Sequence, residues 1–99
     1  MTRALAARGG FEYWTRRTEE LGARAVVNFD HPADRDLEAL TAEHRRVLLP
    51  ALAALLDGTE RVVCDLGCGA GRLTADFAAL IGGRASGVEP VAALRALAP

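Results

Sequence analysis

Two carboxylates and three closely spaced glycines carry most of the chemistry that this sequence can support. Asp65 comes just before Gly67, Gly69 and Gly71, and Glu89 follows 18 residues after the last of these glycines. Glycines let a backbone turn sharply and approach a ligand with no Cβ in the way. Free N–H groups at the start of a following helix can bind polar ligand atoms. A carboxylate about 20 positions further on can accept both hydroxyl protons of a ribose. We therefore predict a nucleoside-binding turn.

The glycine spacing separates two kinds of nucleotide site. The dinucleotide fingerprint is G-x-G-x-x-G, whose third glycine would fall on Arg72, whereas here it comes one residue earlier, at Gly71. Asp65 at the mouth of the turn would repel a pyrophosphate but suits a ligand with ammonium and sulfonium groups. S-adenosylmethionine carries both groups, together with a ribose and no phosphate. The electrostatics favour this cofactor, and we expect Asp65 and Glu89 to flank one shared cleft.

The residues from Cys64 to Leu73, together with Gly87-Val88-Glu89-Pro90, resemble the first two motifs of class I S-adenosylmethionine-dependent methyltransferases. The resemblance covers about residues 61–99. It implies that the glycine turn contacts the methionine portion of the cofactor and that Glu89 binds the ribose hydroxyls. The turn residues that it assigns to the cofactor are Asp65, Gly67, Cys68, Gly69, Ala70 and Gly71.

Residues 10–57 resemble, more loosely, the helical lead-in that many such enzymes lay across the cofactor pocket. Tyr13, Trp14 and Arg17 are therefore candidate contacts to cofactor or substrate, although Trp14 is better read as a packing anchor. The family has a seven-stranded sheet, and this sequence supplies two of those strands. We thus expect an incomplete domain that is inactive by itself, and the sequence does not identify the methyl acceptor or a catalytic base.

Hydrophobic spacing predicts the elements of the first half. We expect a helix over Gly10–Gly22 and then a short strand or buried connector over 25–29. Residues 30–32 should break the chain and start the next helix. From Asp34 to Leu56 the apolar spacing is helical. Pro50 should kink this segment or split it into two helices.

The second half of the sequence predicts five features in order: a strand, a glycine turn, a helix, a second strand and a second helix. Residues 61–66 and 84–88 are the strands, 73–81 is the helix between them, and another helix begins near Val91. The expected fold class is α/β: a Rossmann-like parallel sheet, incomplete because it contains only the first βαβ unit, preceded by N-terminal helices. Residues 1–57 would form the helical lead-in, and 58–99 the first part of the S-adenosylmethionine-binding domain.

Composition and charge exclude several other classes. The 99 residues form at most one domain, and 12 basic and 13 acidic residues, interspersed, give no basic face for nucleic acid. No apolar run reaches the roughly 18 residues that cross a bilayer, and no signal peptide is evident, so we expect a cytoplasmic protein. Cys64 and Cys68 make neither a metal site nor a disulfide framework. Cys64 should lie in the strand core, and Cys68 should fit the turn rather than act as a nucleophile.

The expected function is therefore methyl transfer from S-adenosylmethionine, and two alternatives stay open. One is an NAD-type Rossmann domain; the other is a non-catalytic remnant that serves as an interaction module. A parallel sheet of two strands leaves edges and faces uncovered, so we also expect marginal stability or self-association through the sheet edge. Arg72 should be solvated or paired with a carboxylate, and His44 should lie on a helix surface.

Overall fold

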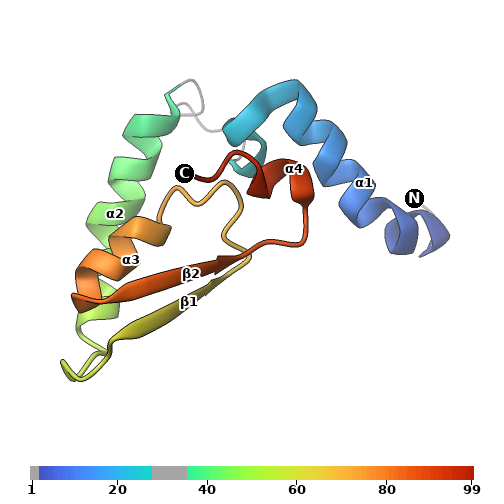
Figure 1. Cartoon of the computed structure of the whole chain (residues 1–99). Coiled ribbons are helices and arrows are strands. Elements are labelled where there is room, and N and C mark those ends of the chain that lie inside the picture. Colours follow the sequence, from blue (N-terminus) through green and yellow to red (C-terminus); the bar gives the residue numbers. More distant parts are fainter. Residues whose placement is uncertain (1–2, 28–35) are drawn as a thin grey trace.

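A computed structural model describes residues 3–27 and 36–99, with side-chain surroundings from residue 10 onward. It is a mixed α/β fold in which helices precede two parallel strands joined by a helix (Figure 1). Within the described ranges, no helix is both long and apolar enough to cross a membrane. The elements are α1 (Arg3–Leu21), the 3₁₀ helix η1 (Gly22–Val26), α2 (Leu37–Ala53), β1 (Val62–Leu66), α3 (Thr74–Ile81), β2 (Arg84–Val88) and α4 (Ala92–Arg95).

The β-α-β unit agrees with the prediction. β1 and β2 pair in parallel, with Val62 opposite Arg84 and Leu66 opposite Val88. α3 connects the two strands and packs against both. Both strands consequently end at the same edge of the sheet, where the glycine turn leaves β1 and Glu89 follows β2.

The two faces of the sheet differ in how far they are covered. Along β1, Val63 and Asp65 are half-buried, whereas the residues between and beside them are exposed. Val62 is 59% exposed and Leu66 is 78% exposed. Cys64 is also exposed, so the prediction that it lies in the strand core is wrong. That prediction assumed a parallel strand buried on both faces, and this strand is covered on one.

The open sheet face has a consequence for the behaviour of the chain in solution. Because apolar side chains such as Leu66 and Val88 remain exposed, we expect marginal stability or self-association. Light scattering after size exclusion should detect species larger than the monomer, and Leu66→Gln should shift the population toward monomer. A sharp, reversible melt of a monomeric wild-type chain near ordinary mesophile temperatures would contradict this expectation.

The N-terminal helix is longer than predicted, and the segment after it is helical. α1 begins at Arg3 rather than at Gly10, because residues 4–7 (Ala-Leu-Ala-Ala) favour helix by propensity even without an apolar stripe. The predicted strand or connector is instead η1, whose Ala25 is buried. Of the two structures predicted for this segment, a short strand or a buried connector, the observed one is the buried connector. The predicted break at 30–32 lies outside the described residues.

The second helix runs as one piece past its proline. Asp36 caps its N-terminus by accepting a hydrogen bond from the N–H of Ala39 at 3.0 Å. Pro50 lies within the helix, which continues to Ala53, so the predicted split into two helices does not occur. A proline so close to the C-terminal end removes little of the hydrogen-bond ladder, and the N–H of Ala54 still bonds to the carbonyl of Pro50 at 3.2 Å.

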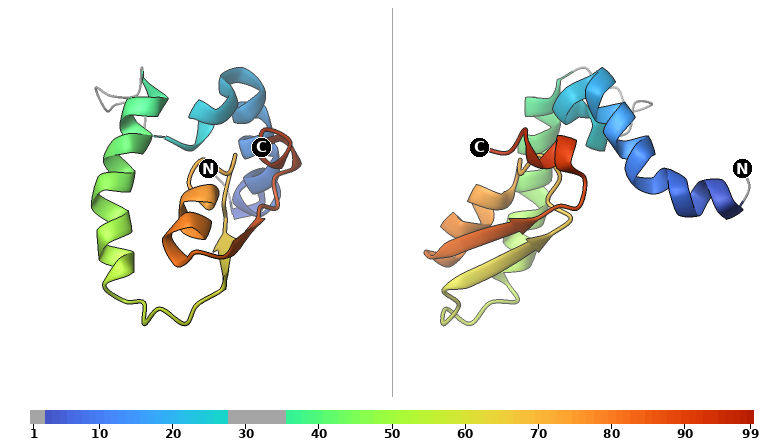
Figure 2. Two further views of the ribbon diagram at one scale, coloured as in Figure 1. Left: turned by 60° about the vertical axis from the view of Figure 1, so that its left-hand side comes forward. Right: turned by 45° about the vertical axis from the view of Figure 1, so that its right-hand side comes forward.

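A small core joins the N-terminal helices to the end of the β-α-β unit. Ala25 of η1 packs with Val91 and with Leu94 of α4, and Leu21 and Val26 pack around them. α1 also contacts α4 directly. This packing places α1 and η1 beside the end of the sheet at which the glycine turn lies, while α2 and α3 lie together on the other side of the molecule (Figure 2).

Candidate functional site

The glycine turn between β1 and α3 is tied to the neighbouring strand. The N–H groups of Gly67 and Cys68 both donate to the carbonyl of Val88, at 2.8 and 3.2 Å. Gly67, Gly69 and Gly71 all have positive φ, at 69°, 60° and 76°. These angles are ordinary for glycine and unfavourable for residues with a side chain. The turn therefore depends on the glycines that the sequence pattern singled out.

Two glycines also allow close packing around the turn. A Cβ on Gly69 would lie 3.2 Å from Cγ1 of Val26, so this glycine lets η1 approach the turn. A Cβ on Gly87 of β2 would lie 2.7 Å from Sγ of Cys68. Gly87 thus makes room for the Cys68 side chain beside the sheet.

Glu89 links the glycine turn to the start of α4. Its Oε1 accepts a hydrogen bond from the N–H of Gly69 at 2.9 Å, and its Oε2 accepts one from the N–H of Val91 at 3.0 Å. The Arg95 guanidinium donates to the backbone carbonyl of Glu89 at 2.6 Å. An ionised carboxylate has about four acceptor sites, so each Glu89 oxygen can accept a further hydrogen bond from a ligand.

A cleft of about 400 Å³ opens beside these residues. On one side it is formed by the turn, Glu89 and the residues after β2; on the other it is formed by α1 and η1. A volume of this size is within the range of small-molecule sites. The lining residues are Gly10, Phe11, Trp14, Val26, Gly67, Gly69, Glu89, Pro90, Val91 and Leu94.

Three of the predicted cofactor residues, Gly67, Gly69 and Glu89, meet in this cleft. The other predicted residues of the turn, Cys68, Ala70 and Gly71, belong to the same loop but do not line the cleft, and Ala70 is buried. The turn thus presents part of its backbone, rather than all of it, to the cleft.

Asp65 lies close to the turn without lining the cleft. Its Oδ2 accepts a hydrogen bond from the Thr74 hydroxyl at 2.7 Å, at the start of α3. It lines a separate apolar hollow of about 260 Å³ between β1, α2 and α3. The expectation that Asp65 and Glu89 flank one shared cleft is therefore wrong, because the Asp65 carboxylate bonds to Thr74 at the start of α3 and only Glu89 lines the cleft. A carboxylate at this place also favours the N-terminus of α3 electrostatically.

Cys68, in the glycine turn, is close enough to both Asp65 and Glu89 for their charges to act on its thiol. Burial first, and then the negative charges of Asp65 and Glu89, raise the pKa of the Cys68 thiol above its ordinary value. The thiol form is consequently favoured, and the thiol form is a poor nucleophile. This agrees with the prediction that Cys68 fits the turn rather than performing chemistry.

The aromatic residues of α1 supply the far side of the cleft. Trp14 lines it and is 38% exposed, and Tyr13 packs edge-on against Trp14 with ring centroids 5.3 Å apart. Phe11 also lines the cleft and was not among the predicted site residues. Its position three residues before Trp14, on the same helix face, is the signal that could have identified it.

Arg17 holds η1 against α1. Its Nε donates to the carbonyl of Ala25 at 2.7 Å, and its Nη2 donates to the carbonyl of Val27 at 3.2 Å. These contacts are with the backbone of the chain itself, and Arg17 does not line the cleft. The structure thus gives this residue a supporting position beneath the candidate site.

Loss of the Arg17 guanidinium should destabilise the fold. We expect Arg17→Met to lower the free energy of unfolding by about 1–2 kcal/mol, because two backbone carbonyls lose a charged donor while the aliphatic stem is retained. Urea unfolding measures the change. Arg16→Met, at an exposed position on the same helix, is the matched control. Equal stability of the two variants would contradict this role.

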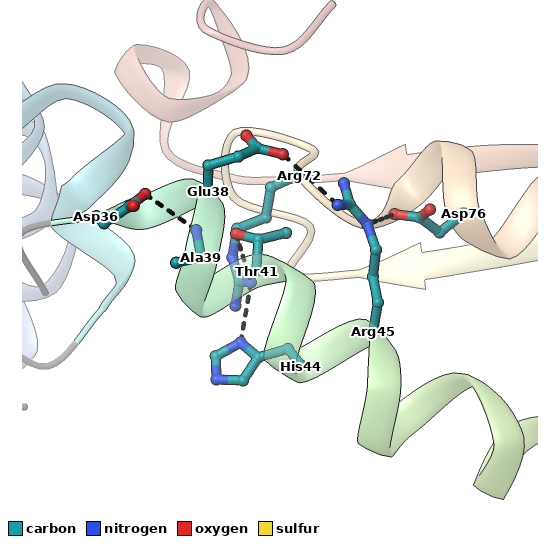
Figure 3. Close-up of polar contacts among 8 residues, drawn as sticks. All are labelled: Asp36, Glu38, Ala39, Thr41, His44, Arg45, Arg72 and Asp76. Atoms are coloured by element: carbon teal, nitrogen blue, oxygen red, sulfur yellow. Dashed lines mark hydrogen bonds and ion pairs between the residues drawn. The ribbon is translucent and has the colours of Figure 1, made fainter. Parts of the chain in front are cut away.

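A polar contact zone joins α2 to the exit of the glycine turn (Figure 3). Arg72 donates to the Thr41 hydroxyl at 3.3 Å and contacts Nδ1 of His44 at 3.0 Å. Next to it, Nε of Arg45 donates to Oδ2 of Asp76 in α3 at 2.8 Å. The prediction that Arg72 is solvated or paired with a carboxylate is wrong, because its partners are the Thr41 hydroxyl and the His44 imidazole on α2. His44 is only half-exposed for the same reason.

Comparison of the chain with protein-family models, with curated proteins and with solved structures gave no match. Over residues 3–27 and 36–99, no cluster of three or more His, Cys, Asp or Glu side chains is arranged to hold a metal ion.

Proposed function

We propose that this chain binds S-adenosylmethionine in the cleft between the glycine turn and α1, as the cofactor-binding part of a methyltransferase. The observation that carries the proposal is the meeting of Gly67, Gly69 and Glu89 in one cleft at the carboxyl ends of two parallel strands. Ligands of open α/β sheets bind at that edge. The methyl acceptor is unidentified, and a cytoplasmic location remains part of the proposal.

The chemistry of the cleft suits this cofactor. Gly69 presents backbone without a Cβ, and Glu89 has acceptor sites left for two ribose hydroxyls. Phe11 and Trp14 offer flat apolar surface to a nucleoside base. Among the described lining residues, Glu89 is the charged one, and a carboxylate at this place suits the ribose of either kind of cofactor, so the glycine spacing, with Arg72 where a dinucleotide site has its third glycine, is what favours S-adenosylmethionine.

The residues assigned here bind and orient the cofactor. S-adenosylmethionine supplies an electrophilic methyl group on its sulfonium, and transfer requires an acceptor in line with it at roughly 3–3.5 Å. Glu89 would fix the ribose, and the backbone around Gly67 and Gly69 would fix the methionine portion. Asp65 and Cys68 have supporting roles. Asp65 accepts a hydrogen bond from the Thr74 hydroxyl, and Cys68 packs beside Gly87. A general base is needed only where the acceptor must lose a proton.

Calorimetric titration with S-adenosylhomocysteine, the demethylated cofactor, tests the proposal. We expect saturable binding of one molecule per chain and no binding of NAD⁺ under the same conditions. Binding of NAD⁺ or NADH without binding of S-adenosylhomocysteine would overturn the assignment in favour of the dinucleotide alternative. Methyl transfer by the chain itself would exclude the alternative of a non-catalytic remnant.

A further inference from the structure

Arg72 is a half-buried cation that directly follows the glycine turn. It comes one residue after Gly71, and its two hydrogen-bond partners, Thr41 and His44, lie on α2, 31 and 28 residues away in sequence. Thr41 is only 3% exposed, so the contact is inside the protein rather than on its rim. Figure 3 shows the Arg72 side chain reaching from the loop to these two residues. Arg72 therefore joins α2 to the exit of the glycine turn.

Among the described residues, the carboxylates near this contact pair with other arginines and not with Arg72. On α2, Arg45 pairs with Asp76 of α3 at 2.8 Å, and it also lies 3.6 Å from Glu38. Glu43, the neighbour of His44, pairs with Arg46 along the helix. Burial, and then the positive charge of Arg45, lower the pKa of the Arg72 guanidinium.

The contact between Arg72 and His44 depends on the protonation state of the imidazole. A guanidinium is always charged and can only donate hydrogen bonds. Nδ1 of His44 can accept at 3.0 Å only while that nitrogen carries no proton. Protonation would remove the acceptor and place two cations in contact.

We propose that Arg72 is a positioning residue that holds the exit of the glycine turn against α2 through Thr41 and neutral His44, so that protonation of His44 weakens ligand binding in the cleft. The link to ligand binding rests on the proposed function. The path is short: Arg72 adjoins Gly71, whose N–H bonds to the carbonyl of Cys68 at 2.9 Å, and Gly69 between them lines the cleft.

The direction of the pH effect follows from the hydrogen-bond acceptor, which is Nδ1 of His44. The Arg72 contact is complete when His44 is neutral and is lost as the pH falls and His44 gains a proton. The affinity for S-adenosylhomocysteine should fall about tenfold on acidification once His44 is protonated, the effect of losing one hydrogen bond to a charged group. A substitution that supplies a neutral acceptor without a titrating proton should remove this dependence.

The test compares the pH profile of S-adenosylhomocysteine affinity in four proteins. Wild type should show the fall. His44→Asn should bind like wild type near pH 8 and lose the pH dependence, whereas Arg72→Met should bind more weakly throughout and also lose it. His31→Asn should keep the wild-type profile, which controls for the second histidine of the chain. A flat wild-type profile, or an unchanged slope in His44→Asn, would overturn the proposal.

A readout without ligand separates this proposal from the proposed function. The thermal midpoint of the unliganded chain, followed by circular dichroism, should fall on acidification more steeply in wild type than in His44→Asn. If that difference is present but S-adenosylhomocysteine does not bind near pH 8, the contact between α2 and the turn stands and the proposed function fails. If the two midpoints fall in parallel, the role of His44 is refuted whatever the chain binds.

Discussion

The Gly69→Val protein is expected to bind no S-adenosylhomocysteine at concentrations that saturate the wild type. Gly69 has φ of 60°, and a residue with a Cβ pays roughly 1–2 kcal/mol to adopt that region, with a β-branched residue less tolerant still. The new Cβ would lie 3.2 Å from Cγ1 of Val26, and the branched side chain would stand where the ligand must approach. Calorimetry measures the loss, which should exceed about 3 kcal/mol, or about 150-fold.

Gly82→Val separates the loss of binding from simple backbone strain. Gly82 has φ of 61°, nearly the value at Gly69, but it ends α3 and does not line the cleft. A Cβ there would meet no heavy atom within 4 Å. We expect this variant to be less stable than wild type and yet to bind with wild-type affinity. Equal effects of the two valines, or normal binding by Gly69→Val, would place the ligand elsewhere.

Glu89→Ala should weaken S-adenosylhomocysteine binding by about 1–3 kcal/mol, or about 5- to 150-fold. The substitution removes the carboxylate proposed to accept the ribose hydroxyls. It also removes the acceptor that holds the N–H of Gly69 at 2.9 Å, so the turn itself is less well positioned. Glu89→Gln keeps one acceptor oxygen and loses the charge, and we expect it to fall between wild type and Glu89→Ala.

Glu60 offers a matched control for Glu89. Its two carboxylate oxygens accept hydrogen bonds from the N–H groups of Asp57 and Gly58, both at 3.0 Å, in the loop between α2 and β1. Glu60→Ala therefore removes the same kind of support from a backbone turn at a distance from the cleft. It should reduce stability without changing affinity. If Glu89→Ala binds as tightly as Glu60→Ala does, Glu89 has no role in the ligand site.

The β-α-β unit could be predicted because its signals are local. The run Val62-Val63-Cys64 is apolar and begins with two β-branched residues. The three glycines that follow it have the spacing of a tight strand-to-helix turn. The second strand has the predicted bounds, Arg84–Val88. The convergence of the turn and Glu89 follows from parallel pairing, since adjacent parallel strands end at one edge.

The remaining features depend on contacts between residues far apart in the sequence. The helical form of residues 22–26 is set by packing of Ala25 against Val91 and Leu94, which no local pattern contains. Likewise, the partners of Arg72 are 28 and 31 residues away.

Asp65 illustrates a different limit of the sequence pattern. Strand alternation orients this residue toward α3, where Thr74 supplies a hydroxyl donor. A motif fixes the position of the carboxylate along the chain. Which face of the strand is covered, and the partner that the carboxylate meets there, depend on how α3 packs against the sheet.

The most direct test of the cleft assignment is to observe the backbone amides by NMR while S-adenosylhomocysteine is added. The resonances of Gly67, Gly69 and Glu89 should shift together and saturate with the ligand, and so should the indole N–H of Trp14, the single tryptophan of the chain. Saturating ligand that leaves these four resonances in place, or that shifts residues around Phe77 of the other hollow instead, would contradict the account.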